Sequence, residues 1–126
     1  MVIIDTSIWV PALRDKNSRE QATVSRLVRS GGAATVGVVL LEVLRGARTS
    51  ADFEELNYQL HAAEFIDVSE ASWIKAAGLM LELKLRGETI PLPDAIIAGQ
   101  ALEGDHQVWT SDEHFKRVPG LRLYRP

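Results

Sequence analysis

The sequence predicts an α/β fold in which a parallel sheet is covered by helices. Short, continuous apolar runs alternate with amphipathic segments of helical period, and this alternation is typical of parallel strands that are buried on both faces. The chain has 126 residues, of which 46% are hydrophobic, so it is large enough to bury one compact core. No repeat, low-complexity segment or linker interrupts it, and we expect a single domain over residues 1–126.

The first half of the chain predicts two strands and four helices. The second helix begins where Ser18 and Gln21 have the spacing of a capping box, and Gly31-Gly32 ends it. In order, the expected elements are a buried strand at 2–4, a short helix at 7–13, a helix from 18 to 30, a strand at 34–38, and helices at 40–47 and 51–63.

The second half predicts two further strands, two helices and a possible edge strand. Ser69 begins a long helix that Gly87 ends, and we interpret its stripe of apolar residues as core packing. That stripe consists of Trp73, Ala76, Ala77, Met80 and Leu83. The other expected elements are strands at 64–68 and 107–110, a helix from Asp94 to 102 that ends at Gly104, and an edge strand at 121–124.

The composition limits the class of protein. A formal net charge of −3 argues against a protein that coats nucleic acid by general basicity, although it does not exclude a nuclease. Zero cysteines exclude disulfide scaffolds and cysteine zinc sites, and fit a reducing compartment. No apolar stretch approaches the roughly 18 residues that a membrane span requires, and the first run is too short for a signal peptide. We therefore expect a cytoplasmic protein without membrane association.

Four acidic residues mark places where an apolar run gives way to a turn or a helix: Asp5, Glu42, Asp94 and Asp112. In an open parallel sheet, ligands bind beyond the carboxyl ends of the strands, and all four acids fall at or near such ends. Carboxylates gathered there repel one another unless a cation lies between them. Because hard divalent cations prefer oxygen ligands, the pattern indicates a Mg²⁺ or Mn²⁺ site.

Each acid also has an ordinary structural interpretation. Asp5 and Asp94 are placed to cap the helices that follow them, and Asp112 fits a turn. Glu42 has the spacing to pair with Arg45 on a helix surface. Capping, however, gives no reason for Glu42 to interrupt the apolar run of residues 38–44, so this glutamate calls for a partner. Basic residues follow three of the acids and indicate a basic rim: Arg14, Lys16, Arg19, Arg45, Arg48, Lys116 and Arg117.

Four segments together resemble the PIN domain, and more narrowly the VapC-type ribonuclease toxins of bacterial toxin–antitoxin pairs. The resemblance runs nearly end to end, and all four segments occur in the family's order. They are Val2-Ile3-Ile4-Asp5-Thr6-Ser7, Leu41-Glu42-Val43-Leu44-Arg45-Gly46, Leu92-Pro93-Asp94-Ala95-Ile96-Ile97-Ala98 and Thr110-Ser111-Asp112-Glu113-His114-Phe115.

The resemblance implies a three-layer α/β/α sandwich with a central parallel sheet. It also implies that the four acids form the family's catalytic and metal-binding quartet, with Ser7 and Thr110 as supporting hydroxyls that orient ligands or water. A catalytic role for His114 is not expected, because the family is usually explained without a histidine and a histidine beside Phe115 is more often structural.

The resemblance further implies a Mg²⁺- or Mn²⁺-dependent endoribonuclease that cuts RNA by activated water and leaves a 5′-phosphate and a 3′-hydroxyl. The implied partners are an RNA substrate, a cognate VapB-type antitoxin and a second copy in a homodimer. Trp9, Val10 and Leu13 are candidates for dimer contact, with core burial expected for at least half of them.

Three other functions compete with this interpretation. A haloacid dehalogenase-type phosphatase needs a second aspartate two residues after the first, where this chain has Ser7. A receiver module needs an adjacent acidic pair near the first strand, which is not evident. The third alternative is a catalytically weak PIN scaffold that acts as an RNA- or protein-binding module, and the presence of all four acids argues against it.

Overall fold

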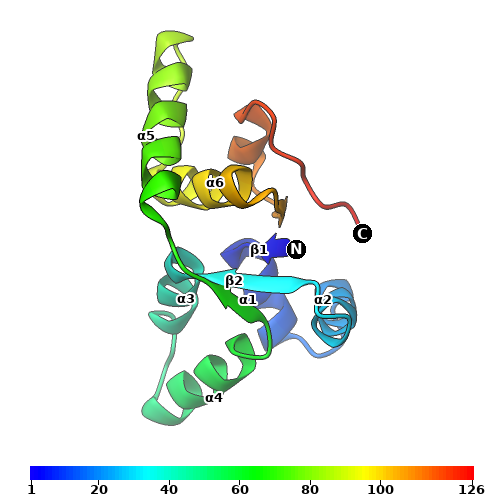
Figure 1. The fold of residues 1–126 in the computed structure, drawn as a ribbon. Helices are drawn as coiled ribbons and strands as arrows, with labels where there is room; N and C mark the ends of the chain where they lie inside the picture. The colour runs from blue at the N-terminus through cyan, green and yellow to red at the C-terminus, as the bar shows by residue number, and fades with distance from the viewer.

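The structure, a computed structural model, describes residues 1–126 (Figure 1). Four strands alternate with six α-helices, and a 3₁₀ helix follows the last strand. The elements are β1 (Val2–Ile4), α1 (Thr6–Arg14), α2 (Arg19–Arg29), β2 (Ala33–Val36), α3 (Gly37–Leu44), α4 (Ser50–Leu60), β3 (Glu64–Ile66), α5 (Glu70–Leu85), α6 (Leu92–Gly104), β4 (Gln107–Trp109) and η1 (Glu113–Arg117). No helix combines the length and the apolar character needed to cross a bilayer.

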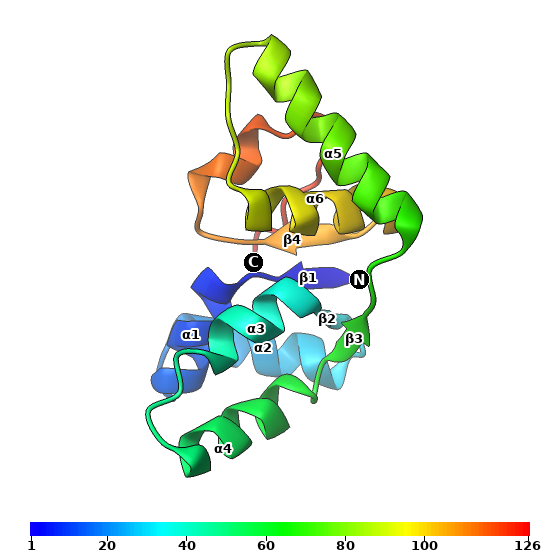
Figure 2. The same ribbon diagram turned by 90° about the vertical axis from the view of Figure 1, so that its left-hand side faces the viewer.

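The strands form one parallel sheet in the order β3-β2-β1-β4 (Figure 2). The chain therefore moves outward from β1 to β3 and then returns to place β4 on the other side of β1. This reversal makes the β1/β4 boundary a topological switch point, where open α/β sheets form a crevice beyond the carboxyl ends of the strands. The parallel, helix-covered sheet that the sequence predicts is confirmed.

The continuous apolar runs are strands because both sheet faces are covered. β1 and β2 are buried along their whole length, and Ile3, Ile4, Ala34 and Val36 have no exposed surface. These side chains belong to a core of 26 buried residues that joins the sheet to the helices. Burial on both faces explains why these runs do not alternate between apolar and polar residues.

Three helices begin at a serine or threonine whose side chain caps the helix N-terminus. Ser18 accepts a hydrogen bond from the Gln21 backbone N–H at 3.0 Å, as the sequence predicts. Ser69 and Thr49 make the corresponding bonds for α5 and α4. Each cap satisfies one of the backbone donors that a helix start leaves free and typically contributes about 1 kcal/mol.

Every predicted strand after the first ends earlier than expected or is reduced to a bridge. β3 ends at Ile66 instead of 68, and β4 ends at Trp109 instead of 110. The sequence predicts a strand over 34–38, but β2 stops at Val36, which pairs with the last residue of β3, Ile66. Beyond Val36 no neighbouring strand continues the backbone pairing, and α3 begins directly at Gly37. The expected strand at 121–124 is reduced to one bridge between Val108 and Leu123.

The apolar stripe expected on α5 is wrong in part. Trp73 is 50% exposed and Ala77 is also exposed, whereas the buried face consists of Ser72, Ala76, Leu79 and Leu83. The helix is rotated because α5 packs closely on α6 (Figure 2). A Cβ placed on Gly99 of α6 would lie 2.8 Å from the Ser72 carbonyl oxygen and 3.0 Å from the Ala76 backbone nitrogen. Only a small-residue face of α5 permits this approach.

We expect Gly99→Ala to destabilise the protein by about 1–3 kcal/mol, because the added methyl group overpacks against backbone atoms that have no room to yield. Urea unfolding followed by circular dichroism measures this change.

Gly78→Ala on α5 is the matched control, because a Cβ there meets nothing within 4 Å. That variant should be as stable as the wild type or more stable by up to about 1 kcal/mol, through helix propensity alone. Equal stability of the two variants would contradict the close α5–α6 packing.

Candidate metal centre

The candidate site lies at the carboxyl end of the sheet, at the β1/β4 switch point. Asp5 directly follows β1, and Thr110 directly follows β4. A hydrogen bond of 3.0 Å from the Asp5 backbone N–H to the Trp109 carbonyl oxygen extends the pairing of the two strands to this point. The parallel register thus brings residues more than a hundred positions apart in sequence to one edge.

Asp5 is buried, and its carboxylate is directed to hydroxyl groups rather than to the helix that follows. It occupies the N-cap position of α1 but makes no side-chain cap bond. Its Oδ2 accepts hydrogen bonds from Ser7 Oγ and Thr110 Oγ1, both at 2.8 Å. The cap interpretation of Asp5 is therefore wrong.

The two hydroxyls also order the loop after β4. Ser7 Oγ accepts a hydrogen bond from the Ser111 backbone N–H at 3.1 Å, and Thr110 Oγ1 accepts one from the Asp112 backbone N–H at 2.9 Å. Each hydroxyl thus donates to Asp5 and accepts from a backbone N–H of the loop after β4. The network holds Asp5 and the start of η1 in a fixed relation.

Asp94 lies in the first turn of α6 and carries the clearest electrostatic signature of the site. Partial burial raises its pKa, the negative charges of Asp112 and Asp5 raise it further, and a hydrogen bond from His114 opposes the shift, so the pKa is about 6. The Asp94 side chain forms no helix cap. Beside the effect of burial, the shift shows that the hydrogen bond from His114 does not fully offset the negative charges of Asp112 and Asp5.

Asp112 and His114 complete the cluster from the end of β4. Asp112 caps η1, because its Oδ1 accepts a hydrogen bond from the His114 backbone N–H at 2.9 Å. The His114 ring Nδ1 lies 2.8 Å from Asp112 Oδ1 and 3.2 Å from Asp94 Oδ2. One donor atom from each of these three side chains lies within 4.8 Å of the others. His114, which the sequence predicts to be structural, therefore lies among the acids, and its position two residues after Asp112 was a usable signal for this.

Glu42 lies on α3 and contacts Thr6, the residue that follows Asp5. Its Oε1 accepts a hydrogen bond from the Thr6 hydroxyl at 3.1 Å, and the alternative interpretation, a pairing with Arg45, is not found. Glu42 is not among the charges that raise the pKa of Asp94. The structure therefore groups Asp5, Asp94 and Asp112 as an inner set, with Glu42 at its border.

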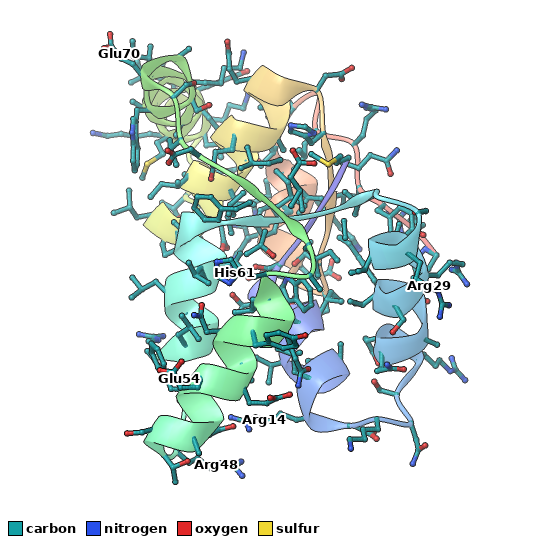
Figure 3. All side chains as sticks on the ribbon, turned by 60° about the horizontal axis from the view of Figure 1, so that its bottom comes forward. Arg14, Arg29, Arg48, Glu54, His61 and Glu70 are labelled. Carbon is teal, nitrogen blue, oxygen red and sulfur yellow. The ribbon has the colours of Figure 1, made fainter.

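Part of the basic rim is held by acidic and carbonyl partners. Arg14 makes two hydrogen bonds to Asp52, at 2.8 and 2.9 Å, and holds the pKa of that carboxyl at about 2. The Arg48 backbone N–H donates to the same carboxylate, and Figure 3 shows Arg14 and Arg48 at the same end of the molecule. Both arginines line a hollow of about 200 Å³ that also includes Glu42. This hollow offers positive charge beside Glu42.

Two larger hollows lie away from the acids. One of about 540 Å³ lies between α1, α2 and α4, and one of about 600 Å³ lies between α5, α6 and residues 119–120. Neither is lined by Asp5, Asp94, Asp112 or His114. The chemistry of the side chains, and not the size of a cavity, locates the candidate site.

The inner residues fit a divalent cation. Carboxylate oxygens are the ligands that Mg²⁺ and Mn²⁺ prefer, and imidazole nitrogen is accepted by transition metals. An ion at this place would offset the negative charges of Asp112 and Asp5, which add to the effect of burial in raising the pKa of Asp94. The arrangement can therefore hold a cation against a phosphate group.

Known proteins of similar sequence and structure include ribonucleases. The chain is 26% identical over 126 residues to Ribonuclease VapC1 of Methanocaldococcus jannaschii. This alignment covers 98% of this chain and 86% of that protein. It is 27% identical over 125 residues to Ribonuclease VapC18 of Mycobacterium tuberculosis. That alignment covers 94% of this chain and 87% of that protein. A chain of the DNA-bound VapBC2 crystal structure from Rickettsia felis matches with a TM-score of 0.86 at 25% identity, covering 98% of both chains.

The family assignment rests on nearly the whole chain. Residues 2–121 match the family model of the PIN domain. That span includes every strand, every helix and all members of the acidic cluster. The chain belongs to the PIN domain family.

Proposed function

We propose that this protein is a metal-dependent endoribonuclease toxin of the VapC type, inhibited by a cognate antitoxin. The observation that carries the proposal is the inner set of carboxylates at the β1/β4 switch point, where the pKa of Asp94 is raised to about 6. The similarity to two VapC ribonucleases over most of their length supports RNA as the substrate.

Asp5, Asp94 and Asp112, with Glu42 at the border, would hold Mg²⁺ or Mn²⁺. When bound, such an ion polarises a phosphodiester and lowers the pKa of an attacking water. The supply of oxygen donors and the absence of cysteine ligands suit a hard cation of this kind.

The chain's own residues position the groups and receive the proton. Ser7 and Thr110 fix the Asp5 carboxylate by two 2.8 Å hydrogen bonds and serve as supporting residues. Glu42, which lies at the border with a single hydroxyl partner, is placed to accept the proton of the attacking water. Water attacks phosphorus in line and the bond to the 3′ oxygen breaks, which leaves a 5′-phosphate and a 3′-hydroxyl.

The hollow lined by Arg14 and Arg48 suits the RNA backbone. A guanidinium group binds phosphate oxygens well, and the Arg48 side chain has no ion-pair partner in the structure. An acidic centre beside a basic rim reconciles the net charge of −3 with an RNA substrate.

We also propose a VapB-type antitoxin and a second copy of this chain as protein partners. The related VapBC2 structure contains both proteins of that system. Several large apolar side chains on α3 and α5 remain exposed here and are suited to protein contact: Leu41, Trp73, Ile74, Leu81 and Leu85. The surface suggested by residues 9–13 is less suitable, because Trp9 is only 2% exposed and Leu13 is half-buried, while Val10 is 41% exposed.

Three further parts of the proposal concern the setting of the protein. Residues 1–126 form a single PIN domain, supported by one core of 26 buried residues.

The protein acts in the cytoplasm, where RNA and the antitoxin are made. The alternative, a catalytically weak PIN scaffold that binds RNA or protein, is disfavoured by the presence of Asp5, Glu42, Asp94 and Asp112 around one edge.

The experiment that tests the proposed function is RNA cleavage by purified Asp5→Asn protein in Mn²⁺. The variant keeps the shape of the side chain but loses its charge, so we expect cleavage to fall by at least about a hundredfold, as for removal of an electrostatic catalytic group. Expression of the wild type alone should arrest growth, and expression of the variant should not.

Asp67→Asn is the matched control, because Asp67 is exposed and lies outside the site, where it bonds only the Val68 backbone N–H. It should cleave RNA as the wild type does. Equal cleavage by wild type and Asp5→Asn, after purification that removes host nucleases, would refute the proposed function.

We expect Asp94→Asn to stabilise the metal-free protein at neutral pH. The pKa of Asp94 is higher in the folded state than in the unfolded state. Below about pH 4 the side chain is protonated in both states, so the wild type loses no folding stability to its charge. As the pH rises through about 6 the buried side chain must ionise, and the wild type loses stability that the neutral asparagine keeps. Allowing for partial exposure, the gain is roughly 1 kcal/mol, or about 2–5 °C in Tm, above pH 7. Thermal unfolding in EDTA at pH 4 and pH 7.5 measures it.

In Mn²⁺ the wild type should be more stable than Asp94→Asn, because the ion binds the folded state of the wild type and stabilises only that protein. A variant that is less stable than the wild type in EDTA at pH 7.5 would show that Asp94 is not repelled by its neighbours.

A further inference from the structure

His114 is placed in the acidic centre by its own turn. Its backbone N–H donates to Asp112 Oδ1, and its ring Nδ1 lies 2.8 Å from the same oxygen. Because η1 begins at Glu113, the ring and the carboxylate are held by one short turn and do not depend on a flexible loop. Its side chain is 40% exposed, so the ring is not a core residue.

The distances from the ring nitrogen match those between ligands of one ion. Neighbouring ligands that lie about 2.1 Å from an octahedral ion are about 3.0 Å apart. Nδ1 lies 2.8 Å from the Asp112 oxygen and 3.2 Å from the Asp94 oxygen, which bracket this value. The contact of His114 Nδ1 with Asp94 has the geometry of a hydrogen bond, and its contact with Asp112 does not. A hydrogen bond therefore does not explain why Nδ1 lies closer to the Asp112 oxygen.

We propose that His114 Nδ1 is a direct ligand of the metal ion, together with Asp94 and Asp112, and that it gives the site a preference for Mn²⁺ over Mg²⁺. The inference rests on the proposed metal-dependent function and deepens it. Carboxylate and water ligands suit Mg²⁺, whereas an imidazole nitrogen favours first-row transition metals. One nitrogen in an otherwise oxygen-based site therefore decides which of the two ions binds more tightly.

The competing interpretation is a structural one, in which the ring only hydrogen-bonds to Asp94 and covers the rim of the site. In that case the ring remains near the ion without touching it, and its removal changes both affinities alike. The two interpretations differ in the bonding of the ion itself, which spectroscopy detects directly.

The experiment compares three proteins loaded with Mn²⁺ alone. Wild type, His114→Gln and His61→Gln are each titrated with Mn²⁺ and with Mg²⁺ by calorimetry, and the Mn²⁺ forms are measured by electron spin echo spectroscopy. His61→Gln is the matched control, because His61 lies at the end of α4, where its Nδ1 bonds the Asn57 carbonyl oxygen. Glutamine keeps a polar group at each position but removes the ring nitrogen.

We expect nitrogen modulation from a coordinated imidazole in the wild type and in His61→Gln, and none in His114→Gln. The His114→Gln change should weaken Mn²⁺ binding by at least about tenfold. It should change Mg²⁺ binding by less than about threefold, because an amide oxygen is an acceptable ligand for Mg²⁺.

Mn²⁺ binding to the wild type without nitrogen modulation, or modulation that persists in His114→Gln, would overturn the role of His114. The metal site itself would then still stand, provided that Asp94→Asn loses Mn²⁺ binding. No binding of Mn²⁺ to the wild type at millimolar concentration would instead overturn the proposed metal-dependent function, and this inference with it.

Discussion

Electrostatic repulsion among carboxylates at one sheet edge is the constraint on which the rest of the structure depends. Asp5, Asp94 and Asp112 come from three separate parts of the chain. Burial of Asp94, and then the negative charges of Asp112 and Asp5, raise the pKa of Asp94 to about 6. No nearby lysine or arginine pairs with any of them. A fold that gathers such charges gives up stability in the metal-free state, and the energy is recovered only when a cation binds the folded protein.

The scaffold supports this arrangement by rigid local connections. β1 and β4 are neighbours in the sheet, and the hydroxyls of Ser7 and Thr110 bridge the ends of the two strands through the Asp5 carboxylate. On the far side of β4, α6 is held against α5 by the close approach at Gly99, and this packing fixes the first turn of α6, where Asp94 lies. Asp5 and Asp112 are thus held in relation to each other through the Thr110 hydroxyl, whereas Asp94 is positioned by the packing of α6.

Much of this could be predicted from the sequence because the signals are local. An acid that ends a buried apolar run identifies both a strand and its carboxyl end, and this was sufficient for Asp5 and Asp112. The part that could not be predicted depends on tertiary contacts. The rotation of α5 is set by Gly99 of its neighbour, so the exposure of Trp73 could not be read from helical spacing. The ring of His114 enters the site because η1 is a tight 3₁₀ turn, which no periodic pattern indicates.

We propose that one captured cation joins the inner carboxylates. Crystals of the protein soaked in Mn²⁺, with diffraction data collected on both sides of the manganese absorption edge, locate such an ion directly. We expect one strong anomalous peak within bonding distance of the carboxylates of Asp94 and Asp112, on the side that faces Asp5. A fully occupied manganese peak elsewhere on the surface, with these carboxylates unliganded, would contradict it.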